Sequence, residues 1–142
     1  MGIEAGERIL VSRDPRKLEV FQMADALVVD VYRSTRALPV EERFGLQAQI
    51  RRAAISVPTN IVEGSARRSA RDYSHFLNIA LGSASETRYL LELSSRLDFL
   101  PAKESQTLAD RYERLSRALS SLIAHFDAVP KAQGPKPKAQ ST

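Results

Sequence analysis

The residues with the clearest potential for chemistry are five arginines in the middle of the chain. They are Arg51, Arg52, Arg67, Arg68 and Arg71. Glu63 is the single acidic residue among them, although the whole chain of 142 residues carries a net charge of only +4. A guanidinium group presents a planar fork of N–H donors that matches two phosphate oxygens at once. The cluster therefore predicts contacts to the phosphates of RNA or DNA that do not depend on base sequence.

A structural use of the same arginines is the alternative interpretation. Arg52 is within reach of a carboxylate at Glu86, and Arg67 and Arg68 are ordinary residues for a solvated turn. Aromatic residues make up only 6% of the chain and few of them adjoin the arginines, so we expect no surface on which nucleic-acid bases stack.

The sequence offers little for catalysis or metal binding. There is no cysteine, and His75 and His125 are the only histidines, so we expect no metal site and no cofactor. Asp72 and His75 are close enough for an acid–base pair, but Asp72 is better explained as part of a helix start. The chain has no glycine-rich phosphate loop, no nucleophile elbow and no Glu-x-x-His motif. We therefore expect no catalytic residues.

The elements that must position the arginines are helices. Apolar residues recur every three or four positions, and nothing alternates with the period of two that a strand requires. Helices are expected from Asp14-Pro15 to Pro39, from Glu41 to Gly64, from Ser69 to Leu97 and from Pro101 to Pro130. The prediction is an all-α, antiparallel up-and-down four-helix bundle. Three helices plus a hairpin, or an open helical array, are the alternatives.

This bundle is expected to occupy residues 14–129. Residues 1–13 show no sustained pattern and are predicted to be loosely ordered, and the basic Pro/Lys-rich tail at 130–142 is predicted to be disordered. No apolar run is long enough for a membrane span, and the start of the chain does not resemble a signal peptide. We expect a cytoplasmic protein without membrane contact.

Regular apolar rows predict which side of each helix faces the core. The second helix contributes Leu46, Ile50, Ala53, Val57 and Ile61, and the fourth contributes Leu108, Tyr112, Leu115, Leu119, Leu122 and Phe126. In the third helix the expected core row is Phe76, Ile79, Leu90, Leu93 and Leu97, with Ser83 and Glu86 in its middle. A buried carboxylate needs a partner, so Glu86 is expected to contact Gln49 or Arg52.

The second helix has a second apolar side, formed by Ala48, Ile55 and Val62 beside Pro58. A helix that is apolar on two sides is usually covered on two sides, so we expect this one to pack against another subunit as well. Pro58 is expected to bend it toward that neighbour. Gly82 and Ser83, in a run of small residues, are expected to allow the close approach of a helix. Asn60 and Glu63 are expected to tie the helix end to the start of the next helix, with Gly64 left-handed at the turn.

Two stretches carry a resemblance to a known family. They are GLQAQIRRAAISVPTNIVEGSARRS (45–69) and DYSHFLNIALGSASETRYLLELSSRL (72–97). They resemble the 23S rRNA intervening sequence proteins, which are related to the accessory variability protein of diversity-generating retroelements. The resemblance covers Leu18 to Phe126. It implies a left-handed bundle of four helices, assembled as a ring-like homopentamer with a central channel, and no known catalytic activity.

Two functions follow as expectations. One is a non-enzymatic oligomeric scaffold for protein interactions, with a reverse transcriptase or another neighbouring protein as a partner. The other is an RNA- or DNA-binding protein that uses the five arginines, including a role as a reverse-transcriptase accessory protein. An enzyme and a helix-turn-helix DNA reader are weaker alternatives, the latter because its helices are usually shorter.

Overall fold

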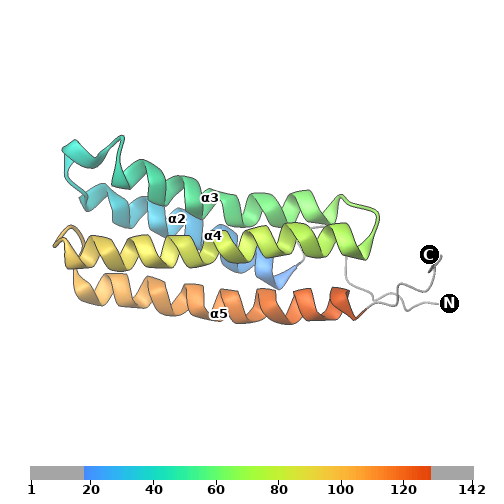
Figure 1. Ribbon diagram of the computed structural model, residues 1–142. Helices are drawn as coiled ribbons and strands as arrows, with labels where there is room; N and C mark the ends of the chain where they lie inside the picture. Colours follow the sequence, from blue (N-terminus) through green and yellow to red (C-terminus); the bar gives the residue numbers. More distant parts are fainter. Residues whose placement is uncertain (1–17, 129–142) are drawn as a thin grey trace, which may run out of the picture.

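The computed structural model describes residues 18–128, and this part of the chain is all-helical, with no strand. Its four long helices are α2 (Glu19–Ser34), α3 (Leu46–Ser65), α4 (Ala70–Arg96) and α5 (Ala102–Asp127). Figure 1 shows them lying side by side, with the α3–α4 turn at one end of the molecule and the α4–α5 turn at the other. Two short 3₁₀ turns, η2 (Thr35–Ala37) and η3 (Val40–Glu42), connect α2 to α3. The all-α prediction is confirmed.

The connection between α2 and α3 is longer than predicted. Helix α2 ends at Ser34 instead of continuing to Pro39, and α3 begins at Leu46 instead of Glu41. At the start of α3 the carboxylate of Glu42 accepts a hydrogen bond from the backbone N–H of Leu46, at 3.0 Å. This bond satisfies one of the donors that a helix start leaves without an intrahelical partner. The predicted helix start at Asp14-Pro15 lies outside the described residues.

Helix α4 begins at the predicted cap. The Ser69 hydroxyl accepts a hydrogen bond from the backbone N–H of Asp72, at 3.0 Å. The same helix ends at Arg96, and Asp98, which the sequence did not single out, has a φ of 63° and so turns the chain out of the helical path. Pro101 then caps α5, as its fixed φ favours.

One hydrophobic core joins all four helices. The predicted core rows of α3 and α5 are buried along most of their length, from Ile50 to Ile61 and from Leu108 to Leu119. The predicted core row of α4 is wrong in most positions, although Leu90 is buried and Leu93 packs against the core. The other buried residues of α4 lie about one position away from that row, and they are Tyr73, Ser74, Leu77, Ala80, Ala84, Thr87, Leu91 and Ser94.

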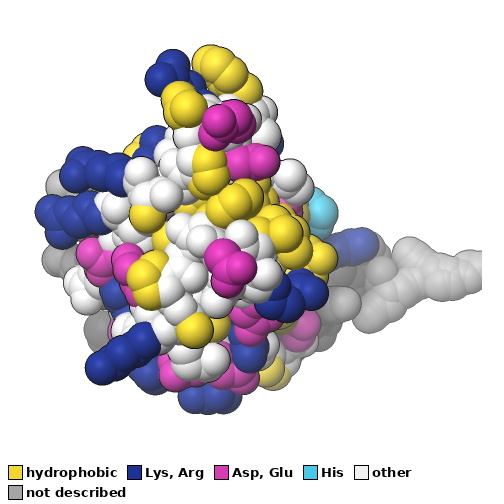
Figure 2. Space-filling view, turned by 90° about the vertical axis from the view of Figure 1, so that its left-hand side faces the viewer, with side chains coloured by type: hydrophobic (Ala, Val, Ile, Leu, Met, Phe, Trp, Pro, Cys, Tyr) yellow, Lys and Arg dark blue, Asp and Glu magenta, His cyan; other side chains and the backbone are white. Residues whose placement is uncertain are grey.

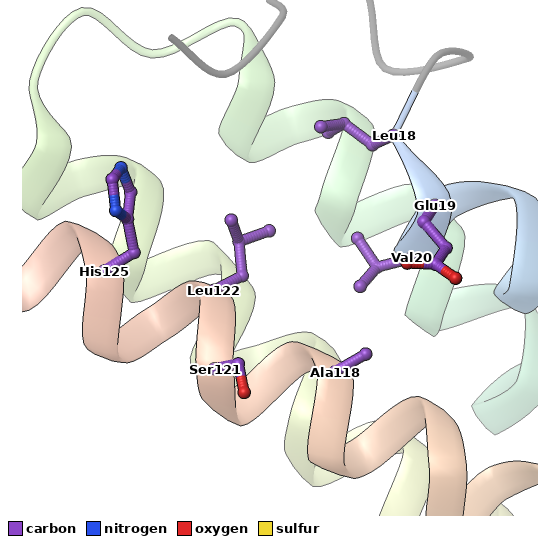
Figure 3. Close-up of a pocket in the computed structure, with 7 residues that line it drawn as sticks. All are labelled: Leu18, Glu19, Val20, Ala118, Ser121, Leu122 and His125. Atoms are coloured by element: carbon purple, nitrogen blue, oxygen red, sulfur yellow. The ribbon is translucent and has the colours of Figure 1, made fainter. Parts of the chain in front are cut away.

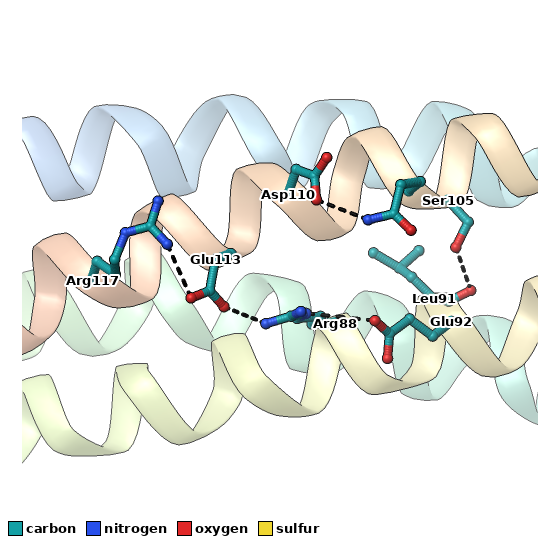
Figure 4. Close-up of polar contacts among 8 residues, drawn as sticks. Arg88, Leu91, Glu92, Ser105, Asp110, Glu113 and Arg117 are labelled. Carbon is teal, nitrogen blue, oxygen red and sulfur yellow. Dashed lines mark hydrogen bonds and ion pairs between the residues drawn. The ribbon is translucent and has the colours of Figure 1, made fainter.

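Polar contacts hold α4 against α5 along the outside of this core (Figure 4). Arg88 on α4 forms an ion pair with Glu113 on α5, and Glu113 also pairs with Arg117 at 3.1 Å. The buried hydroxyl of Ser105 donates a hydrogen bond to the backbone carbonyl of Leu91, at 3.0 Å. Within residues 18–128, no helix combines the length and the apolar character that a membrane span requires.

Candidate functional site

The structure divides the five arginines between two places. Arg51 and Arg52 lie near the start of α3, whereas Arg67, Arg68 and Arg71 lie beyond its end. An α-helix rises about 1.5 Å per residue, so the two groups are separated by roughly 20 Å. They do not form one basic patch.

Arg51 is half-buried and makes several contacts within its own chain. Its Nε donates a hydrogen bond to the Thr35 hydroxyl at 2.9 Å, and its Nη2 donates one to the Tyr32 carbonyl at 3.0 Å. The guanidinium also lies over the Tyr32 ring, with its carbon 4.4 Å from the ring centroid. These contacts fix the α2–α3 connection, and they depend on residues of α2 and η2 that sequence reasoning did not associate with Arg51.

Arg67 is also engaged within the chain. It forms an ion pair with Glu63, one turn earlier, and its guanidinium carbon lies 4.8 Å from the centroid of the Phe76 ring. The other three arginines of the cluster are exposed and have no ion pair to a described carboxylate; they are Arg52, Arg68 and Arg71.

Asn60 and Glu63 do not tie α3 to α4 directly, contrary to the prediction. Asn60 donates hydrogen bonds to the carbonyl and the hydroxyl of Ser56, at 2.8 and 3.0 Å, and Glu63 pairs with Arg67. The link to α4 is instead the hydrogen bond between the hydroxyls of Ser56 and Ser83, at 2.8 Å. Asn60 therefore supports the helix contact by holding Ser56.

Gly64 lies inside α3 and is not left-handed, because no described glycine has a positive φ. A Cβ on Gly64 would lie 3.0 Å from Phe76 Cβ and 3.0 Å from Tyr73 Cδ1. The glycine is required because α4 approaches the α3 backbone closely at this point. Gly82 has no such role within the chain, since a Cβ there would meet nothing within 4 Å.

Glu86 is exposed, so its predicted burial is wrong. Gln49 and Arg52 are exposed too, and no described residue forms an ion pair with Glu86. Arg52 precedes Ser56 by one turn of α3, and Glu86 follows Ser83 by one turn of α4. Both side chains are exposed, so two opposite charges lie at the surface near the Ser56–Ser83 hydrogen bond.

The row that was predicted to face the core lies at the border between the core and the outer surface of α4, where Leu93 still packs against the core. Its apolar members range from buried Leu90 to Ile79 and Leu97, which are 40% and 48% exposed. On α3, Ile55 and Val62 are 41% and 42% exposed, beside half-buried Pro58. Helix α3 continues without interruption through Pro58. We call these residues of α3 and α4 the outer face.

A groove of about 490 Å³ lies beside this face, where α3 leaves the α2–α3 connection. Its lining combines arginines with aromatic and aliphatic side chains: Tyr32, Arg43, Phe44, Gln47, Ala48, Arg51, Arg52 and Ile55. We call it the hinge groove. Figure 2 looks onto this end of the molecule, where hydrophobic and basic side chains lie next to one another. Few aromatic residues adjoin the arginines in the sequence, but the fold brings Tyr32 to Arg51 and places Phe44 beside Arg43.

A second hollow, of about 470 Å³, lies between the start of α2 and the end of α5 (Figure 3). Leu18 and Val20 face Ala118 and Leu122 across it, so its walls are mainly apolar. Its titratable side chains, Glu19 and His125, come from opposite walls. In residues 18–128 no group of three or more histidine, cysteine or acidic side chains is placed to hold a metal ion.

Comparison with known proteins gives a consistent result. A protein of unknown function from the S23 ribosomal protein family of Bacteroides thetaiotaomicron VPI-5482, whose crystal structure was determined at 1.70 Å, is similar in structure with a TM-score of 0.68. The two are 28% identical in sequence, over 73% of this chain and 97% of the Bacteroides chain. No curated protein matches the sequence. Neither the family nor this structural neighbour indicates a catalytic activity.

The sequence profile of the 23S rRNA-intervening sequence proteins matches residues 16–121, which include all of α2, α3 and α4 and most of α5. The matched region contains both the outer face and the hinge groove. This chain belongs to the 23S rRNA-intervening sequence protein family.

Proposed function

We propose that this protein is a non-enzymatic, cytoplasmic scaffold that assembles with copies of itself through the outer face. In this proposal each chain is an antiparallel up-and-down bundle, and five chains form a ring, as the family resemblance implies. The observation that supports self-assembly is the row of α4 that has the spacing of a helix–helix contact but leaves Ile79 and Leu97 uncovered by the chain's own helices.

The row extends from Phe76 to Leu97 in alternating steps of three and four residues, which is the spacing by which one helix packs against another. Ser83 and Glu86 interrupt its apolar character in the middle. The apolar side chains of this row and of α3 form a surface from which burial would remove water. A second copy is the fitting partner because the α3 part of the face carries Arg52 and the α4 part carries Glu86, so the α3 part of one chain can meet the α4 part of the next, and a ring requires two such different surfaces on each chain.

Substitution of Ile79 tests the proposal. Ile79→Glu places a charge in the middle of the proposed contact, where an unpaired buried carboxylate is costly. Light scattering at micromolar concentration should give about five times the 15.8 kDa of one chain for the unchanged protein and one chain for the variant. The matched control is Val29→Glu on α2, because Val29 is 44% exposed and lies outside the outer face.

The control variant should keep the mass of the assembly, and circular dichroism should show the same helix content in all three proteins. If light scattering gave the unchanged protein the mass of a single chain, self-assembly would be refuted. An Ile79→Glu protein that keeps the mass of the assembly would show that the contact lies elsewhere.

Nucleic-acid binding is a second candidate function. It is favoured by Arg52, Arg68 and Arg71, which are exposed and have no carboxylate partner among residues 18–128. Assembly would repeat this set of charges in every subunit and so raise the affinity through avidity. A partner such as a reverse transcriptase would also be consistent with this function.

The corresponding test is the affinity for labelled single- and double-stranded RNA and DNA as a function of salt. We expect the affinity to fall steeply with rising salt and to differ little between sequences. Replacing Arg68 and Arg71 by serine should make the affinity fall less steeply with salt. The control is Arg33→Ser, which removes an exposed arginine of α2 that pairs with Asp30 at 3.7 Å and should change the salt dependence less. If none of the labelled nucleic acids binds at about 50 mM salt, this function is excluded.

A further inference from the structure

The hinge groove combines exposed apolar side chains with uncompensated positive charge. Phe44 is 88% exposed and Val40, in the same connection, is 68% exposed. These are the two largest exposed fractions among the large hydrophobic residues that the structure describes. Ile55 on α3 extends the apolar lining to the edge of the outer face. A cluster of this kind on a folded domain commonly marks a binding surface.

The positive charge comes from Arg43, Arg51 and Arg52, none of which forms an ion pair with a carboxylate in residues 18–128. Arg51 is held by its bonds to Thr35 and Tyr32, so its guanidinium has a fixed position at the groove wall. A preorganised charge loses little conformational entropy when it binds a ligand. The groove is therefore suited to a ligand with both an apolar group and negative charge.

We propose that the hinge groove binds a short acidic segment of a partner protein. An aromatic or aliphatic side chain of that segment packs against Phe44, and its carboxylates meet Arg43 and Arg51. The inference rests on the proposed scaffold function, because it supplies the class of partner that the scaffold recruits. Arg52 stands at the border with the outer face and is not required for it.

The surroundings of the groove favour an acidic peptide over a nucleic acid. A polynucleotide presents a phosphate at every step, so its binding surfaces are extended basic tracks. Here Glu41 and Glu42 precede Arg43 in the sequence, so the positive charge is confined to a short stretch that suits one or two carboxylates and not a run of phosphates. Arg68 and Arg71 lie beyond the far end of α3 and do not extend the positive charge. Val40, which lies in the same connection outside the groove lining, adds an exposed aliphatic group that suits a peptide side chain.

Selection of peptides on the intact protein tests this inference. A phage-displayed library of random dodecapeptides is selected on the immobilised full chain and counter-selected on a Phe44→Ser variant. We expect the enriched peptides to be acidic and to share one large apolar residue. Their affinity, measured by fluorescence anisotropy, should fall about tenfold in Phe44→Ser and in Arg43→Ser, which is typical for the loss of an anchor residue.

The matched controls are Val29→Ser, an exposed apolar residue outside the groove, and Arg33→Ser, an exposed arginine outside the groove. Both should bind the enriched peptides as the unchanged protein does. Because the groove lies within one chain, Ile79→Glu should also retain the peptide affinity, so that failure of self-assembly and failure of the groove are distinguishable.

Three results would overturn the inference. One is a selection that enriches no peptides, or only neutral or basic ones. Another is peptide affinity that Phe44→Ser and Arg43→Ser leave unchanged. The third is an oligothymidylate or oligouridylate that competes for the groove, binds more tightly than every selected peptide and depends on Phe44, which would identify the groove as a nucleic-acid site.

Discussion

Gly64 is the residue whose predicted role differs most from its role in the structure. The sequence pattern predicted a left-handed turn residue, because glycine commonly ends helices. In the structure Gly64 is helical and buried, and its missing side chain lets Tyr73 and Phe76 of α4 approach the α3 backbone. What distinguishes the two roles is the neighbouring helix, which the local sequence does not contain.

Substituting Gly64 and Gly82 by alanine distinguishes a glycine that is required for close helix packing from one that is not. Gly64→Ala should destabilise the protein by about 1–3 kcal/mol, because the added methyl group overlaps Tyr73 and Phe76. Gly82→Ala should stabilise it by about 0.5–1 kcal/mol, because alanine favours a helix and meets no atom within 4 Å. Urea unfolding of both variants measures the two changes. Equal effects of the two substitutions would contradict this account.

Tyr112 provides a second prediction at the residue scale. It is 1% exposed, and its hydroxyl accepts no hydrogen bond of normal geometry among the described residues, since the nearby Thr87 hydroxyl donates to the Ser83 carbonyl instead. Burial raises the pKa of Tyr112 above its ordinary value of 10.0, against the opposite effects of Thr87 and Arg111. The folded state therefore favours the neutral phenol.

Tyr112→Phe should leave the free energy of unfolding unchanged near pH 7 or raise it by up to about 1 kcal/mol, because it removes a buried hydroxyl that lacks a good partner. A raised pKa means that the contribution of the neutral phenol is fully present below pH 10.0 and is lost as the pH rises above that value. Stability should accordingly fall less steeply above pH 10.0 in the variant. Urea midpoints against pH provide the measurement, with exposed Tyr89→Phe as the control.

At the scale of the elements, the start of α4 was predictable because its signal is local. A serine followed three residues later by an acid indicates a helix start, and Ser69 accepts the bond from the Asp72 N–H. The break between α2 and α3 was less predictable. It depends on Arg51 and Gln47, which bond to Thr35 from sixteen and twelve residues away in the sequence.

Removing the cap should measurably weaken α4. Ser69→Ala should lower the free energy of unfolding by about 1 kcal/mol, because the Asp72 N–H loses its partner. Ser120→Ala, at an exposed position inside α5, is the control and should have almost no effect or stabilise slightly. Thermal unfolding followed by circular dichroism compares the two. A Ser69→Ala protein as stable as the control would show that the cap contributes nothing.

The face of α4 illustrates why periodicity alone was insufficient. This helix has two rows with helical spacing, one through Leu77, Ala84 and Leu91 and one through Ile79, Leu90 and Leu97. The second was predicted to be the core row because its apolar residues repeat with a heptad-like spacing. The core selected the first row, because small side chains such as Ala80 and Ala84 allow α4 to pack closely against its neighbours.

At the scale of the whole molecule, the position of Arg52 and Glu86 leads to a prediction about assembly. Both are exposed in a single chain and stand on the same side of the Ser56–Ser83 contact. If the outer face joins two copies, Arg52 of one copy can meet Glu86 of another, away from most of the solvent. An ion pair in such a place has more influence on association than one at a free surface.

Charge reversal tests this arrangement. Arg52→Glu and Glu86→Arg should each reduce the mass measured by light scattering, because each brings like charges together at the contact. The double variant should restore the mass, since it re-creates the pair with the signs exchanged. If the double variant assembled no better than either single one, the two residues would not face each other.

Much about this protein was determined by the sequence itself. The number of the long helices in residues 18–128, the cap at Ser69 and most of the core rows of α3 and α5 follow from periodicity and local hydrogen bonding, which act over a few residues. Membership of the family followed from the stretches 45–69 and 72–97. These features survive in the structure because nearby residues are enough to specify them.

The tertiary structure decided which partners the charged residues have. It turned Arg51 inward to Thr35 and placed Glu86 on the surface. It also brought Tyr32 and Phe44 beside the arginines of α3. The physical reason is that a side chain's partners come from whichever helices pack beside it. That packing depends on volume and close approach along the whole core, not on the spacing of residues within one helix.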